Sequence, residues 1–195
     1  SQESSFTNDL HEQSPEIAVG VKKKGAGDQG MMFGFACNET DSLMPLPISI
    51  AHALVKRMDQ VREENIVKYL RPDGKSQVTI EYRQGKPYKV NQVVIAVPHK
   101  ESINLDDVKD DIYNIVIIPV LDIFGFKIQK KDIVVNGTGI WHHGGPASDC
   151  GVTGRKIVVD TYGGYARVGG GAFSGKEPSK VDRGGAYAAR FLAKN

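Results

Sequence analysis

Hydrophobic and polar positions follow two different periods along the first half of the chain. Residues 45–64 place their apolar side chains at helical spacing, which predicts an amphipathic helix. Residues 76–82 alternate between polar and apolar side chains, and residues 92–97 form a second β-branched run after a Gln-Gly-Lys-Pro turn at 84–87. These two runs predict a β-hairpin.

The pattern continues with a second helix and several shorter elements. Residues 105–121 are predicted to be helical, because Asn104 is a favourable N-cap and Asp106 and Asp107 suit the first turn. Short strands are predicted at 132–135 and 156–159, a strand-like run at 31–35, a glycine-rich loop at 169–175, and an alanine-rich helix at 179–194. This order predicts an α+β fold, with helices on one face of a mixed or antiparallel sheet.

Changes in composition predict three regions. Residues 1–29 form a polar connecting segment, 30–142 a central α+β domain, and 143–195 the start of a region rich in glycine and basic residues. A chain of 195 residues has room for one large domain or two small ones. Because it starts at Ser1 in a polar stretch and ends at Asn195 inside a predicted helix, we expect a longer parent chain.

Composition excludes several classes of protein. With 40% hydrophobic and 25% charged residues, the chain is globular in type and not disordered. No apolar run approaches the roughly 20 residues that cross a bilayer, so no membrane span is expected. Two cysteines make no disulfide framework, which predicts a cytoplasmic setting. The net charge of +2 is too small to predict a nucleic-acid partner.

Two glycine motifs resemble nucleotide-binding fingerprints but lack the required context. Residues 25–30 fit G-x-G-x-x-G, yet lysines precede them and a strand-like run follows, where a dinucleotide site needs a strand and then a helix. Residues 170–176 fit G-x-x-x-x-G-K, but Glu177 replaces the Ser or Thr of a P-loop. The glycine backbone and Lys176 still suit a bound phosphate, and a flexible surface loop is the alternative.

A short stretch near residue 145 holds four side chains of metal-binding type. The spacing of His142, His143, Asp149 and Cys150 matches no common zinc pattern, and adjacent histidines point in different directions. We therefore interpret the histidines as a hydrogen-bonded or surface pair. Both Cys150 and Cys37 are interpreted as small buried hydrophobic residues, and no nucleophile signature is present.

Basic side chains accumulate beside glycine and aspartate from residue 155 onward. Earlier in the chain, an Arg-Pro-Asp-Gly-Lys turn at 71–75 places an aspartate and a lysine just before a predicted strand. Several cations, one or two carboxylates for Mg²⁺ and a flexible backbone are what a polyphosphate site requires. A solvated basic face is the alternative for any single lysine. The basic residues from 155 onward are Arg155, Lys156, Arg167, Lys176, Lys180, Arg183, Arg190 and Lys194.

Long motifs give the chain a family resemblance. The segments GAGDQGMMFGF at 25–35 and GGGAFSGKE at 169–177 resemble the two signatures of the S-adenosylmethionine synthetases, or methionine adenosyltransferases. The resemblance includes DCGVTGRK at 149–156 and DTYGG at 160–164, and it covers most of the chain. It implies repeated, similar α+β domains built from interleaved segments, held incompletely here, and active sites between two subunits.

The resemblance implies synthesis of S-adenosylmethionine from ATP and L-methionine. The methionine sulfur attacks the ribose C5′ and releases triphosphate, which is then cleaved to diphosphate and phosphate. A thioether has no proton to lose, so catalysis needs orientation and preorganised positive charge rather than a general base. The implied cofactors are Mg²⁺ and K⁺, and the implied assembly is a homodimer or a dimer of such dimers.

Matching positions imply individual roles. The resemblance assigns ATP binding to Asp73, Lys75, Trp141, Asp149, Arg155, Lys156, Ala172 and Lys176. Four cations among these are the implied catalytic residues: Lys75, Arg155, Lys156 and Lys176. Methionine binding is assigned to Gln13, Asp28, Asp149 and Lys180, and a Mg²⁺ ligand to Asp182. Residues 11–24 resemble the mobile loop that covers the active site.

The chain departs from the family pattern in three ways. Ile140 and Trp141 replace the usual Arg-Phe, and Val168 replaces the usual His. The family's His-Pro-Asp-Lys segment, its acidic K⁺ ligand and its last portion are not in this sequence. Besides a synthetase with further segments, the alternatives are a non-catalytic ATP- or polyphosphate-binding fragment, a regulatory partner of a complete synthetase, and a structural remnant that dimerises without substrate.

Overall fold

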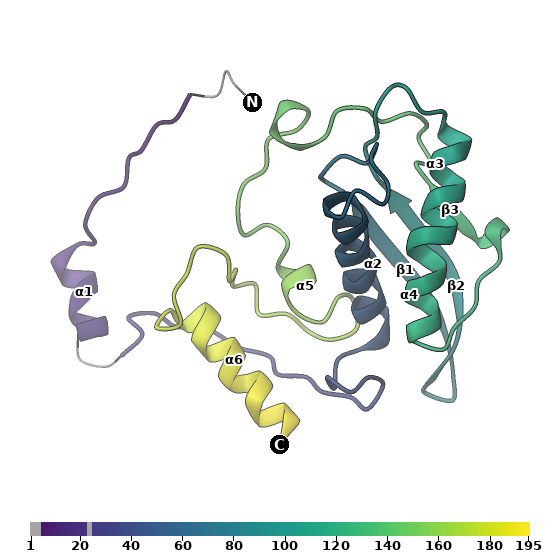
Figure 1. Ribbon diagram of the computed structural model, residues 1–195. Helices are drawn as coiled ribbons and strands as arrows, with labels where there is room; N and C mark the ends of the chain where they lie inside the picture. Colours follow the sequence, from purple (N-terminus) through teal and green to yellow (C-terminus); the bar gives the residue numbers. More distant parts are fainter. Residues whose placement is uncertain (1–4, 23–24) are drawn as a thin grey trace. The chain divides into compact units, whose positions relative to one another are not determined.

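The computed structural model describes residues 5–22 and 25–195, which form two compact units (Figure 1). The first unit is Asn38–Gly151, and the second combines the described residues up to Cys37 with Val152–Asn195. Of the segment predicted to be an active-site loop, Lys23 and Lys24 lie outside the described residues.

A three-stranded mixed sheet forms the centre of the first unit. Its strands are β1 (Lys75–Arg83), β2 (Lys86–Ala96) and β3 (Ile133–Val135), in the order β1-β2-β3. β1 and β2 are antiparallel, and they are joined at Gln84 and Gly85, whose φ angles of 50° and 76° are those of a tight hairpin turn. β3 pairs in parallel with residues 93–95 of β2. The predicted hairpin and mixed sheet are confirmed.

Helices cover one face of this sheet, and Figure 1 shows α2 and α4 in front of the strands. The first is α2 (Leu46–Glu63), and the predicted second helix consists of α3 (Leu105–Asp111), a π-helical segment (Ile112–Ile117) and α4 (Ile118–Ile123). The π-helical segment ends just before Pro119, which lacks the N–H that a continuous α-helix would use.

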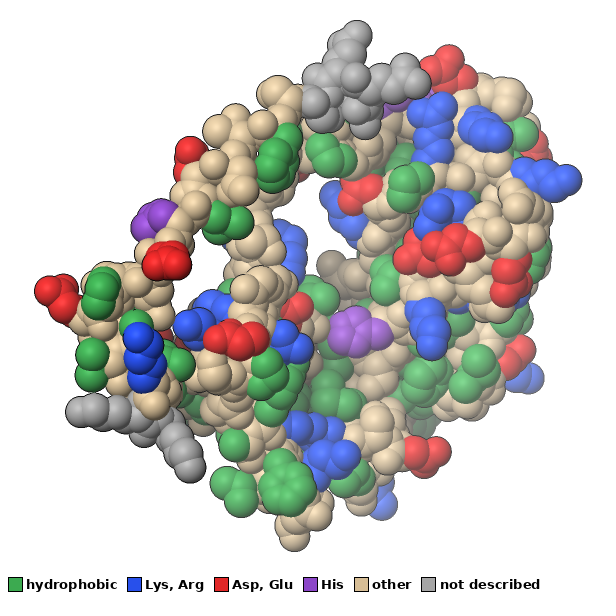
Figure 2. Space-filling view, turned by 60° about the vertical axis from the view of Figure 1, so that its left-hand side comes forward, with side chains coloured by type: hydrophobic (Ala, Val, Ile, Leu, Met, Phe, Trp, Pro, Cys, Tyr) green, Lys and Arg blue, Asp and Glu red, His purple; other side chains and the backbone are tan. Residues whose placement is uncertain are grey.

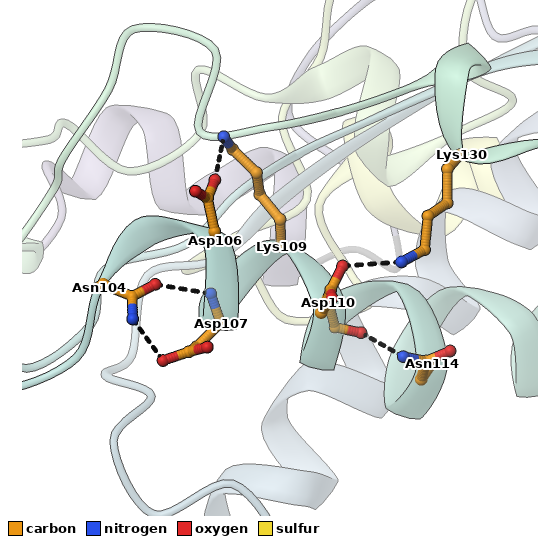
Figure 3. A network of polar contacts seen from close by, with 7 residues as sticks. All are labelled: Asn104, Asp106, Asp107, Lys109, Asp110, Asn114 and Lys130. Atoms are coloured by element: carbon orange, nitrogen blue, oxygen red, sulfur yellow. Dashed lines mark hydrogen bonds and ion pairs between the residues drawn. The ribbon is translucent and has the colours of Figure 1, made fainter.

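Polar side chains fix the start of α3, as Figure 3 shows. The Asn104 side chain accepts a hydrogen bond from the Asp107 N–H at 2.9 Å, which confirms the predicted N-cap. Lys130 lies in a short 3₁₀ turn (Lys130–Asp132) just before β3, and its ammonium donates to Asp110 of α3 at 2.8 Å. This ion pair joins the helix to the segment that leads into the strand.

The hydrophobic core lies between the helices and the sheet. Its fully buried side chains come from α2, β2 and the helix at 105–123, with Leu54, Ile95 and Leu121 as examples. Burying one such side chain contributes about 1.5–3 kcal/mol. Exposed and half-buried positions alternate along most of β1, as the polar and apolar residues of its sequence do. The predicted α+β class is confirmed.

The second unit has no strand among its described residues. Its helices are α1 (Pro15–Lys22), α5 (Ile157–Asp160) and α6 (Val181–Lys194). The strand predicted at 156–159 is wrong, because these residues begin the single turn of α5, and the Thr161 hydroxyl donates to the Ile157 carbonyl at 3.0 Å. Strand propensity reflects packing against neighbouring strands, and the described part of this unit offers none.

The run at 31–35, predicted to be strand-like, instead packs in irregular conformation against α6. The Arg190 guanidinium donates to the Phe35 carbonyl at 2.5 Å. The Phe35 ring lies 5.8 Å from that of Tyr162 and 5.4 Å from that of Tyr165. A Cβ atom on Gly34 would lie 1.9 Å from the carbonyl oxygen of Ala189, so only glycine permits this approach.

None of the helices in the described ranges combines the length and hydrophobicity that a membrane crossing requires. On the face drawn in Figure 2, basic and acidic side chains are interspersed rather than separated. The totals of 25 basic and 23 acidic residues are also nearly balanced.

Tyr69 gives the first unit a measurable dependence on pH. Its hydroxyl donates to Asp111 at 2.7 Å, and burial, followed by this bond, raises the pKa of Tyr69 well above its ordinary value of about 10. A raised pKa in the folded state gives stabilisation that is complete below about pH 10 and is lost as the pH rises through the folded pKa.

We expect Tyr69→Phe to lower the free energy of unfolding by about 1 kcal/mol at pH 8. The variant should also lose less stability than the unchanged protein between about pH 10 and 11, because its ring has no proton to release. Denaturant unfolding of both full-length proteins across this range tests the prediction. The same alkaline loss in both proteins would contradict it.

Candidate functional site

The predicted nucleotide turn lies just before β1 and is held by a glycine pair. Asp73 has a φ of 87°, a conformation that is uncommon for residues other than glycine, and its carboxylate accepts the Gly145 N–H at 2.7 Å. A Cβ atom on Gly144 would lie 3.0 Å from the Pro72 carbonyl oxygen. The two glycines therefore allow residues 144–145 to approach the turn closely.

Lys75 and Trp141 meet beside this turn. The Lys75 ammonium lies 5.2 Å from the centroid of the Trp141 ring, within the range of a cation–π interaction. Asp149 lies farther along the same segment, where its backbone N–H donates to the Gly145 carbonyl at 3.1 Å and its side chain is exposed. The structure thus brings Asp73, Lys75 and Trp141 together within the first unit.

In the second unit, the glycine loop closes against the start of α6. Gly170 and Gly175 have φ angles of 92° and 76°, which favour glycine. The Lys176 ammonium donates to the Asp182 Oδ2 at 2.6 Å. A Cβ atom on Gly171 would lie 2.3 Å from the other carboxylate oxygen of Asp182, so that oxygen rests against the loop.

A second basic segment adjoins the glycine loop. Arg155 and Lys156 are exposed and follow Gly154, which has a φ of 81°. A Cβ atom on Gly154 would lie 2.8 Å from the Cβ of Ala172, so this turn packs directly on the loop. Lys180, just before α6, adds a fourth cation to Lys176, Arg155 and Lys156. The second unit therefore places cations, a carboxylate and glycine backbone next to one another.

Two predicted methionine-binding residues have no such neighbours. Gln13 is exposed just before α1, and the exposed Asp28 accepts the N–H of the next residue, Gln29, at 2.7 Å. Neither one forms a hydrogen bond or an ion pair with another predicted site residue in the described part of the chain. Their role stays a prediction.

The four side chains considered as a metal site do not form one. No cluster of three or more His, Cys, Asp or Glu side chains suited to a metal occurs within 5–22 and 25–195. The His142 ring pairs with the His99 carbonyl at 3.1 Å, and the His143 ring lies 3.4 Å from the Arg71 guanidinium. Cys150 is exposed rather than buried, because its loop lies outside the core.

Sequence reasoning missed two residues that support the nucleotide turn. Arg71 donates to the His142 carbonyl at 2.7 Å, and the fully buried His99 donates its backbone N–H to the Trp141 carbonyl at 2.9 Å. The position of Arg71 two residues before Asp73 was a usable signal. His99 gave none, because its bridge to Leu70 joins residues that are far apart in the sequence.

Comparisons with known proteins identify the family. Residues 23–141 match the family model of the S-adenosylmethionine synthetase central domain, and residues 143–195 match that of the C-terminal domain. The chain belongs to the S-adenosylmethionine synthetase family. The boundary between the two matches falls inside the unit Asn38–Gly151. The boundaries of the compact units in this synthetase chain therefore do not coincide with those of its sequence domains.

Curated relatives named S-adenosylmethionine synthase are similar to almost the whole chain. The one from Parafrankia sp. (strain EAN1pec) is 52% identical in an alignment that covers 94% of this chain and 50% of the relative. The one from Oleidesulfovibrio alaskensis is 53% identical over 192 residues, covering 95% and 49%. A relative from Sulfurovum sp. (strain NBC37-1) is 52% identical, covering 96% and 50%. The chain spans about half the length of these synthetases.

Proposed function

We propose that the full-length protein containing this chain synthesises S-adenosylmethionine from ATP and L-methionine. One observation carries the proposal: the Arg155–Lys156 turn packs on the glycine loop, whose Lys176 contacts Asp182. Such an arrangement suits a polyphosphate, and the relatives are named for a synthase.

The reaction makes the departing triphosphate the main electrostatic problem. A bond forms between the methionine sulfur and the ribose C5′, while the bond from C5′ to the triphosphate oxygen breaks and that oxygen keeps the electron pair. Lys176, Arg155 and Lys156 supply positive charge to this oxygen and its phosphates, and the backbone at Ala172 adds a neutral donor. Hydrogen bonds to charged groups contribute about 1.5–3 kcal/mol each. Water then hydrolyses the released triphosphate to diphosphate and phosphate.

The cluster in the first unit, taken by itself, suits the binding of a nucleotide. The aromatic face of Trp141 offers a stacking surface for adenine, and Lys75 offers a cation to the phosphates. We assign to Asp149 a contact with both substrates, and to Gln13, Asp28 and Lys180 contacts with methionine. Of this set, Lys180 immediately precedes α6, and its ammonium lies 3.8 Å from the carboxylate of Glu177, which follows the glycine loop.

The residues present fit a Mg²⁺ ion at Asp182. Mg²⁺ is commonly held by one or two carboxylates together with substrate phosphates, and Asp182 presents one carboxylate at the proposed polyphosphate loop. When bound, the ion neutralises phosphate charge. We also propose K⁺ as a cofactor, and we assign no residue of the described chain as its ligand. We further propose a homodimer in the cytoplasm.

The test uses the full-length polypeptide, whose extent an intact mass measurement establishes first. We expect this protein to convert ATP and L-methionine to S-adenosylmethionine, detected by mass spectrometry, and to release phosphate and diphosphate. Removal of Mg²⁺ by a chelator should stop the conversion. Binding of Mg²⁺-ATP without product would instead support a binding or regulatory role, and an assembled protein without ATP binding would support a structural one.

A further inference from the structure

Residues 141–143 form a short strap, the Trp141 strap, whose three carbonyl oxygens all accept hydrogen bonds from side chains or backbone of the first unit. The Trp141 carbonyl accepts the His99 N–H at 2.9 Å, and the His142 carbonyl accepts the Arg71 guanidinium at 2.7 Å. The His143 carbonyl accepts the indole N–H of Trp141 at 2.5 Å. The orientation of the indole therefore depends on where residue 143 lies.

His99 holds the beginning of the strap. Its backbone bonds to Trp141, its carbonyl pairs with the His142 ring at 3.1 Å, and the two histidine rings meet edge to face at 4.9 Å. His99 is itself fixed by burial and by the bridge to Leu70. These contacts hold the backbone of Trp141, but none of them reaches the carbonyl to which the indole bonds.

Arg71 holds the end of the strap. The same guanidinium nitrogen that donates to the His142 carbonyl lies 3.4 Å from the His143 ring nitrogen. The Arg71 backbone N–H also donates to the Pro98 carbonyl at 2.8 Å, so this residue is anchored on both sides. Because Asp73 follows it by two residues, Arg71 ties the nucleotide turn directly to the part of the strap that orients the indole.

We propose that Arg71 is a positioning residue, which holds residue 143 so that the Trp141 ring stays aligned beside Lys75 for the adenine of ATP. This inference rests on the proposed function. Adenine lies away from the bond that breaks, so a misaligned ring weakens ATP binding in the ground state and transition state alike. The consequence is a change in KM for ATP rather than in turnover.

Kinetics of the full-length Arg71→Ala enzyme test this role. We expect KM for ATP to rise about 10-fold, while kcat and KM for methionine stay within about 2-fold. Arg71→Lys keeps a cation but not the planar group, so its KM should be intermediate. The matched control is Arg83→Ala, because Arg83 lies on the exposed hairpin with Glu81 and Tyr88 as partners and should leave the kinetics unchanged. An unchanged KM for ATP in Arg71→Ala would overturn the proposal.

A double-mutant cycle separates positioning from simple support of the fold. Trp141→Phe removes the indole N–H, so Arg71→Lys should raise KM for ATP less in this background than in the unchanged enzyme. Equal effects of Arg71→Lys in both backgrounds would overturn the proposal. Because the cycle uses Arg71→Lys, it can be measured even if Arg71→Ala fails to fold. If the unchanged protein makes no product, the proposed function fails, and the positioning role is then tested separately by calorimetry with ATP. Binding of ATP that is about 10-fold weaker in Arg71→Lys or Arg71→Ala than in the unchanged protein supports the positioning role. Equal binding in all forms, or no binding in any of them, overturns it.

Discussion

Replacement of Lys176 by alanine is expected to lower the turnover of the full-length enzyme by about 10²- to 10³-fold. The Lys176 ammonium lies at the end of the glycine loop, 2.6 Å from Asp182, where the proposed triphosphate departs. Negative charge on the bridging oxygen grows as the bond to C5′ breaks, so the cation stabilises the transition state more than bound ATP. We therefore expect kcat to fall much more than KM for ATP rises.

Steady-state kinetics with varied ATP and methionine measure this effect, and Lys86→Ala on the exposed hairpin is the control. The free energy of unfolding should change little in Lys176→Ala. The side chains of Lys176 and Asp182 are 33% and 24% exposed to solvent, and ion pairs that water reaches contribute little to stability. A Lys176→Ala enzyme with nearly normal turnover would refute the assignment of the glycine loop to the polyphosphate.

Gly34→Ala is expected to destabilise the second unit by about 3 kcal/mol, and to lower the thermal unfolding midpoint of the full-length protein by about 5 °C. The added methyl group would lie 1.9 Å from the Ala189 carbonyl oxygen and 3.0 Å from the Arg190 backbone nitrogen. Both atoms belong to the backbone of α6, which a side-chain rotation cannot move. The helix must therefore shift away, and the bond between Arg190 and Phe35 is weakened.

Gly164→Ala is the matched control in the same unit. A Cβ atom on Gly164 meets no atom within 4 Å, and its φ lies outside the left-handed range. This substitution should leave the unfolding midpoint unchanged or raise it slightly, since alanine restricts the unfolded chain. If both variants unfold at the same temperature, the close packing of α6 on residues 31–35 is refuted.

Local signals were sufficient for most of the first unit. The helical spacing of apolar residues predicted α2, the Asn104 cap predicted the start of α3, and period-two alternation predicted the hairpin. In each of these elements, the local conformational preference of the residues matches their pattern of burial. Each element could therefore be predicted from a short stretch of sequence. The strand predicted at 156–159 failed because its β-branched residues have no neighbouring strand, which a window of four residues does not reveal.

The candidate site shows the same division between local and distant information. Motifs placed Asp73 and Lys75 on a turn and Lys176 on a loop. The structure agrees for Asp73 and Lys176, whereas Lys75 is the first residue of β1. Contact between Gly154 and Ala172, and support of Trp141 by Arg71, depend on residues that are far apart in the sequence. No spacing rule brings such residues together, so these contacts became visible only in three dimensions.

The interleaved second unit also bears on how the chain is synthesised. Phe35 and Arg190, which form a hydrogen bond across this unit, are separated by 155 residues. At translation rates of roughly 5–20 residues per second, the ribosome adds the intervening residues in about 8–30 s. During this interval the Phe35 ring and its apolar neighbours have no α6 to cover them, whereas Asn38–Gly151 is continuous and has all its strands before α6 is made. Newly made chains thus pass through a stage in which the first unit is complete while residues 31–37 of the second are still without α6.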